Sequence, residues 1–282
     1  MDRTVGLRGA VLLGLGSILG TGVFVSLGLA VGVTGTWAVP ALCLAAVLAA
    51  LNALSSAELA ASHPVSGGTY AYGYRYLGPD FGFAAGLAFL LAKSASAAAA
   101  AIGLSGYVLA GLGMDPALTN PVASLVAIVM AGLVVLGLRR ANPVNAVLVT
   151  ITLLVLILLG AMALLSPAGE QVANPVTPFA PASFLEATAL LFVAFTGYGR
   201  IATLGEEVQS PRRTIPRAII LTLLVSTCLY LAILTGGLNV LGAARFADAT
   251  TRTAAPLQAV AAVLGAPWLS LLVIVAAVTA MA

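Results

Sequence analysis

Apolar residues fill this chain in long runs that are separated by short polar segments. A run of about 20 apolar residues is long enough to cross a bilayer as a helix. Strand-like alternation with a period of two is absent, which favours a helical bundle over an outer-membrane barrel. The pattern predicts an all-α integral membrane protein with about eight transmembrane helices, at residues 9–31, 38–60, 81–111, 119–138, 144–165, 184–204, 216–241 and 260–282.

Composition supports this assignment, since 61% of the residues are hydrophobic and 7% are charged, against roughly 25% charged residues in a soluble domain. The arginines lie in short clusters between the apolar runs, so they indicate membrane topology and not a nucleic-acid partner. With a cytoplasmic N-terminus, the outside segments carry only Arg245 and Arg252. The inside segments then carry Arg3, Arg8, Arg75, Arg139, Arg140, Arg212, Arg213 and Arg217. This asymmetry predicts a cytoplasmic N-terminus, and we expect the protein in the cell membrane.

The first apolar run contains the stretch GLGSILGTGVF, from Gly14 to Phe24. Each glycine costs up to about 1 kcal/mol in a helix interior, so this stretch predicts an interrupted helix. One explanation is close helix packing, because Gly16 and Gly20 form a GxxxG spacing. The other is a binding site built from the backbone groups that an interruption frees.

A second interruption is expected in the sixth run, which reads LLFVAFTGYGRIATLGEEV. Thr196, Gly197, Tyr198 and Gly199 stand at its middle and Arg200 follows them. Two broken helices in corresponding positions are typical of transporters built from inverted repeats. The pair therefore favours ligand binding over packing alone.

Freed backbone groups at the two breaks suit a zwitterion. Amides at the start of the outer half of the first helix suit a carboxylate, and we assign this role to Gly20, Thr21 and Gly22. Carbonyls at the end of a half-helix suit an ammonium group. We assign that role to the carbonyls around Ser17 and Ile18 and to those near Ala194 and Phe195.

Three segments, in order, resemble the signatures of the amino acid, polyamine and organocation (APC) superfamily of transporters. They are GSILGTGVF, AELAASHPVSGGTYAYGYRYLGPDFGFAAG (Ala57–Gly86) and FVAFTGYGRIATLGEEVQSPRRTIPRAI (Phe192–Ile219). The resemblance implies one transporter domain over residues 1–282, with two inverted five-helix repeats (1–165, and an incomplete 183–282) and broken first and sixth helices. It places an amino acid at Ser17, Ile18, Gly20, Thr21, Gly22, Ala194, Phe195, Thr196 and Gly197.

The same resemblance assigns further roles. The segment PVSGGTYAY, which begins at Pro64, becomes a cytoplasmic loop that gates inward opening, and Phe195 becomes a gate over the bound side chain. Relatives usually have twelve spans, so we expect this chain to be a fragment, a truncated gene model or a shortened paralogue. A shortened homologue that binds or assembles without transporting is the alternative function.

Two cations lie within predicted spans. Lys93 and Arg200 each cost about 2.5 kcal/mol or more at the bilayer centre, so we expect them to face the bundle or a wet cavity; Arg200 has the alternative of reaching the cytoplasmic interface. Their charge would repel a cationic side chain. This predicts a neutral or anionic amino acid as substrate.

One further position concerns the coupling of transport to an ion. Where many relatives have a lysine on the fifth helix, this chain has Thr152, and Lys93 is proposed to take over its charge role by releasing and regaining a proton. The alternatives are that Lys93 only pairs with a carboxylate, or that sodium binds near hydroxyls such as Ser270 or Thr279. No cofactor or metal site is expected, and the lone His63 argues against an enzyme.

Overall fold

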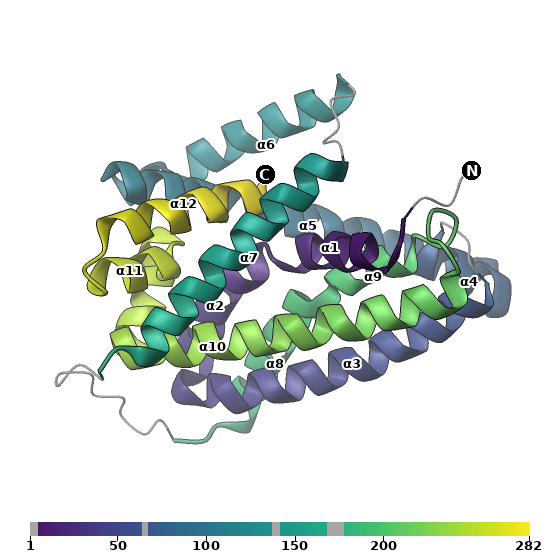
Figure 1. Ribbon diagram of the computed structural model, residues 1–282, viewed down its shortest axis with the longest axis horizontal. Helices are drawn as coiled ribbons and strands as arrows, with labels where there is room; N and C mark the ends of the chain where they lie inside the picture. Colours follow the sequence, from purple (N-terminus) through teal and green to yellow (C-terminus); the bar gives the residue numbers. More distant parts are fainter. Residues whose placement is uncertain (1–4, 64–66, 137–141, 168–177) are drawn as a thin grey trace.

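The computed structural model describes residues 5–63, 67–136, 142–167 and 178–282, and Figure 1 shows it as a bundle of helices. Arg3, Pro64, Arg139 and Arg140, which the sequence analysis used for topology and gating, lie outside the described residues. Throughout the described part the chain is helical, apart from turns and one isolated backbone bridge. The prediction of an all-α membrane protein is confirmed.

Helices follow one another in the order that the apolar runs predicted. The first half of the chain forms α1 (Leu7–Ile18), η1 (Gly22–Ser26), α2 (Leu27–Thr34), η2 (Gly35–Trp37), α3 (Ala38–Ser62), α4 (Gly68–Tyr76), α5 (Pro79–Leu112), η3 (Pro116–Leu118), α6 (Thr119–Val135) and α7 (Asn142–Leu165). The second half forms α8 (Pro181–Phe195), η4 (Thr196–Tyr198), α9 (Gly199–Ala202), α10 (Pro211–Thr253), α11 (Pro256–Val263) and α12 (Pro267–Met281).

Among the described residues, six continuous helical stretches are long and apolar enough to cross a membrane. They are Gly22–Ser62, Pro79–Leu112, Pro116–Val135, Val144–Leu165, Pro181–Ala202 and Pro211–Thr253. The shorter α1 and α12 are also apolar. Each of the eight predicted runs therefore contains helix, although the first and last runs are each divided.

The core forms around α10, which packs against α1, α2, α3 and α7. In Figure 1, α3 and α10 run side by side along the length of the molecule, while α6 lies at an edge beside α5. Small side chains let α3 approach α8 and α10 closely, as in other membrane bundles. Five alanines at a spacing of four residues form this face, each at most 2% exposed: Ala41, Ala45, Ala49, Ala53 and Ala57.

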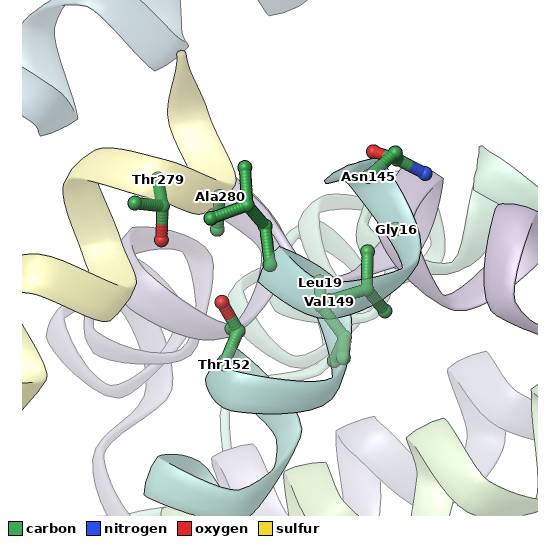
Figure 2. A pocket seen from close by; sticks show the side chains of 8 residues that line it. Gly16, Leu19, Asn145, Val149, Thr152, Thr279 and Ala280 are labelled. Atoms are coloured by element: carbon green, nitrogen blue, oxygen red, sulfur yellow. The ribbon is translucent and has the colours of Figure 1, made fainter. Parts of the chain in front are cut away.

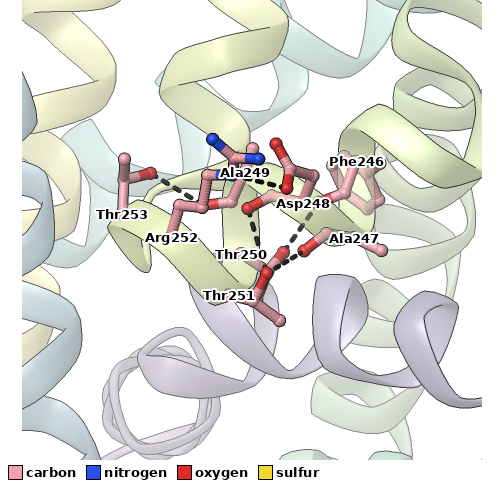
Figure 3. Close-up of polar contacts among 8 residues, drawn as sticks. All are labelled: Phe246, Ala247, Asp248, Ala249, Thr250, Thr251, Arg252 and Thr253. Carbon is pink, nitrogen blue, oxygen red and sulfur yellow. Dashed lines mark hydrogen bonds and ion pairs between the residues drawn. The ribbon is translucent and has the colours of Figure 1, made fainter.

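The seventh span ends close to its predicted end, and the eighth begins later than predicted. The helical backbone of α10 is interrupted at Gly242, directly after residue 241, where φ is 74° and ψ is 163°, and a further helical segment follows to Thr253. Its last turns carry an exposed ion pair between Arg252 Nε and Asp248 Oδ1 (2.6 Å), which Figure 3 shows beside threonine hydroxyls bonded to their own helix. The predicted span 260–282 was wrong at its start, because α11 ends at Val263 and Pro267 starts a separate helix.

Candidate functional site

The first predicted interruption is present between α1 and η1. Helix α1 ends at Ile18, and Leu19 leaves the helical region with a ψ of 74°. The Gly20 amide donates to the Ile18 carbonyl oxygen at 2.9 Å. The chain then resumes as a π-helix over Gly22–Ser26, a rare conformation that is frequent at functional sites.

The second interruption is weaker than predicted. Residues Thr196–Tyr198 tighten into a 3₁₀ turn while keeping right-handed dihedrals, and α9 continues for only four residues. A short 3₁₀ segment inside a helix often marks a hinge. The Ala194 carbonyl, just before this turn, also bonds outside its own helix, as described below.

The two interruptions lie directly against each other. A side chain on Gly197 would collide with the Ser17 carbonyl group, and one on Gly22 would lie 3.0–3.1 Å from Ala194. Contacts also join α1 to η4 and α9, and η1 to α8. Glycine at these two positions therefore permits the close approach: a Cβ at Gly197 would collide with backbone atoms, and a Cβ at Gly22 would crowd the Tyr230 hydroxyl and Ala194.

Tyr230 of α10 connects the two breaks, a role that the sequence analysis missed. Its side chain is fully buried, and its hydroxyl donates to the Ile18 carbonyl at 2.8 Å with the Ala194 carbonyl at 3.3 Å. Its ring lies on the Phe195 ring, with centroids 5.2 Å apart. Acceptors from residues far apart in the sequence therefore converge on one hydroxyl.

A second fully buried tyrosine, Tyr107 of α5, serves the outer half of the first span. Its hydroxyl donates to the Phe24 carbonyl at 2.9 Å, within the π-helix, and accepts from the Leu257 amide at 3.2 Å. Tyr107 thus joins η1 to the first turn of α11. It lies outside the pair of breaks.

The structure brings the predicted binding residues together. Buried members are Ile18, Gly22, Ala194, Phe195 and Gly197, half-buried members are Gly20 and Thr21, and exposed members are Ser17 and Thr196. One expectation needs correction. The Gly20 amide, assigned above to a substrate carboxylate, is bonded to Ile18, because the chain turns back on itself at the break.

Thr152 lines a small cavity that adjoins the first break, with a volume of about 50 Å³. The other lining residues are Gly16, Leu19, Asn145, Leu148, Val149, Thr279 and Ala280. In Figure 2 the hydroxyl oxygens of Thr152 and Thr279 are turned toward each other across the space between α7 and α12. Thr152 is 2% exposed, so its hydroxyl is held in a protected position.

Lys93 and Arg200 are not brought into this cavity. Lys93 is exposed on α5, and its ammonium lies 5.6 Å from the centroid of the Phe89 ring. Arg200 is exposed on α9, three residues after Gly197. The structure therefore separates Lys93 from the breaks and keeps Arg200 near the second of them.

Backbone contacts also join the two inner half-helices beyond the breaks. Before α1, Val5 donates to the Glu207 carbonyl at 3.1 Å and accepts from the Gln209 amide at 2.9 Å. Helix α4 starts close to the end of α9, since a side chain on Gly68 would lie 3.0 Å from Thr203. Within α4, burial raises the pKa of the Tyr72 hydroxyl above its ordinary value.

Residues 9–282 match the family model described as "Amino acid permease". The chain belongs to the amino acid permease family. This permease chain is 40% identical to an uncharacterized transporter of Mycobacterium tuberculosis over 270 residues, which are 95% of the chain and 59% of that relative. It therefore spans about three fifths of the length of that protein.

Two further relatives come from Bacillus subtilis. The branched-chain amino acid permease is 35% identical over 84% of this permease chain and 55% of its own length. The methylthioribose transporter is 30% identical over 83% of the chain and 54% of its own length. A more distant relative, cationic amino acid transporter 9 of Arabidopsis thaliana, is 30% identical over 82% of the chain and 44% of its own length.

Proposed function

We propose that the paired breaks form the binding site of a secondary amino acid transporter that works by alternating access. The observation that carries this proposal is the convergence of the Ile18 and Ala194 carbonyls, one from each break, within 2.8 and 3.3 Å of a single hydroxyl. Oxygen acceptors gathered from both breaks, with the Tyr230 hydroxyl between them, suit an ammonium group, which has several hydrogens to donate. Thr21 and Gly22 begin the half-helix whose positive end suits the carboxylate.

A neutral amino acid is the substrate class that we propose. Phe195 is fully buried beside the converging carbonyls, and Arg200 adds a positive charge just beyond the second break, which disfavours a cationic side chain. Similarity to a branched-chain amino acid permease supports an apolar side chain. Lysine or arginine competing as strongly as leucine would contradict this assignment.

The proposed movement uses the two half-helices as separate units. Val5, Glu207 and Gln209 tie the inner ends together by backbone bonds, while Tyr107 ties the outer half of the first span to α11. Opening toward either side then requires breaking one set of contacts at a time. With the N-terminus in the cytoplasm of the cell membrane, the Val5 contacts and the loop helix α4 form the inner gate.

For coupling, two candidates follow from the sequence: proton transfer at Lys93 and sodium binding near hydroxyls such as Ser270 or Thr279. The cavity favours the second, because Thr152 and Thr279 supply hydroxyl oxygens and hard cations prefer oxygen ligands. Its volume of about 50 Å³ suits one small ion or water. Lys93 does not line this space.

Uptake in liposomes tests the proposed function directly. Protein expressed from its own gene and reconstituted in lipid is expected to accumulate radiolabelled leucine, with weaker competition by lysine than by valine. Binding of leucine without uptake would point to the non-transporting alternative. Failure of the pure, folded protein to bind any amino acid would refute the proposal.

A further inference from the structure

The Tyr230 hydroxyl occupies the point where the two broken helices meet. It lies 2.8 Å from the Ile18 carbonyl and 3.3 Å from the Ala194 carbonyl. A hydroxyl has one hydrogen and cannot fully satisfy two acceptors at once. The Ile18 carbonyl also accepts from the Gly20 amide.

Packing holds this hydroxyl in place. The Tyr230 side chain is 0% exposed and its ring contacts Phe195. On the other side, a side chain on Gly22 would lie 2.6 Å from the hydroxyl oxygen. The ring is fixed, so the hydroxyl has little freedom beyond rotation of its hydrogen, and the carbonyls of both breaks are held at a fixed separation.

We propose that Tyr230 is the positioning residue of the amine subsite, where its hydroxyl holds the two breaks together beside the ammonium group of an amino acid. Its oxygen lone pairs, which the donated bond leaves available, add a further acceptor for that group. This inference rests on the proposed function, and it assigns recognition of the ammonium to α10 in addition to the two broken helices.

The test compares binding of leucine with binding of 4-methylpentanoate, which has the same carboxylate and carbon skeleton but no amino group. In purified wild-type protein in lipid nanodiscs, leucine is expected to bind more tightly. Tyr230→Phe keeps the ring and removes the hydroxyl. The preference for leucine should fall about tenfold, as expected for a lost hydrogen bond to a charged group, while 4-methylpentanoate binds with unchanged affinity.

Tyr107→Phe is the matched control, because it removes another fully buried hydroxyl that bonds a carbonyl of the first span. It should leave the preference ratio unchanged, whereas a general loss of packing would alter both ligands in both variants. Gly22→Ala is a second test in case Tyr230→Phe fails to fold. Its added methyl group would press on the Tyr230 hydroxyl from the opposite side, so it should lower the preference for leucine over 4-methylpentanoate.

The outcomes separate the two proposals. Wild-type protein that binds no amino acid contradicts the proposed function. Wild-type protein that prefers leucine, together with an unchanged ratio in the folded Tyr230→Phe or Gly22→Ala variant, overturns the role of Tyr230 alone. An equal loss of affinity for both ligands in the folded Tyr230→Phe variant shows a structural role only and also overturns it.

Discussion

At the scale of single residues, the glycines of the two breaks have different surroundings. A side chain on Gly20 would meet only the Ala280 carbonyl, at 3.6 Å, whereas one on Gly197 would collide with Ser17. Gly197→Ala is therefore expected to cost about 1–3 kcal/mol of stability through overpacking. Gly20→Ala should leave stability nearly unchanged.

Thermal unfolding of the two purified variants measures this difference. The midpoint should fall for Gly197→Ala and stay close to wild type for Gly20→Ala. Equal midpoints would show that the breaks do not approach each other as closely as the structure indicates.

Gly20 also permits a test of ligand access. Gly20→Leu should abolish leucine binding, because a branched side chain directly before Thr21 and Gly22 would fill the space through which a carboxylate approaches the start of that half-helix. Insertion into the membrane should be intact, since a Cβ at this position meets no atom closer than 3.6 Å. Leucine uptake at the wild-type rate in vesicles that contain the Gly20→Leu variant would contradict this prediction.

Glycine spacing made both breaks predictable from sequence, but the tyrosines were not. Tyr230 stands 212 residues after Ile18, its bonding partner. From sequence alone, a tyrosine in an apolar helix that only packs in the core cannot be distinguished from one that donates a hydrogen bond to a distant carbonyl. Only the packing of α10 against α1 and α8 shows which role it has.

At the scale of helices, α3 depends on its row of alanines. Ala49 lies at the middle of this row and is 0% exposed. Ala49→Leu should force α3 away from its neighbours and destabilise the protein by about 1–3 kcal/mol. Val47→Leu, on the face where Val47 is 56% exposed, is the matched control and should have no effect on thermal stability.

Helix ends were predicted less well than helix positions. The pattern placed the last span at 260–282, although Gly265 and Pro267 together signal a turn and a new helix start. Gly265 indeed has a φ of 70°. Hydropathy averaged over about 20 residues does not detect such a boundary, because α11 and α12 are both apolar.

At the scale of the whole molecule, distant parts of the chain meet at one place. The breaks are far apart in sequence, and α7 and α12 close the cavity beside the first of them. The sequence analysis named Ser270 or Thr279 as hydroxyls that sodium could use and treated Thr152 only as the replacement of a lysine, so it gave no reason to join Thr152 to Thr279. Folding of α12 back onto α7 supplies that reason.

Ion dependence of uptake should show which group couples transport. If the cavity holds the coupling ion, a sodium gradient should drive leucine uptake. Thr152→Ala or Thr279→Ala should then raise the sodium concentration needed for half-maximal uptake by about tenfold, because each variant removes one oxygen ligand. Ser270→Ala is the matched control, since Ser270 is on the same helix as Thr279 and does not line the cavity. Lys93→Met should keep its sodium dependence. Uptake that follows a proton gradient and is lost in folded Lys93→Met protein would instead assign coupling to Lys93, and uptake indifferent to both gradients would exclude both sites.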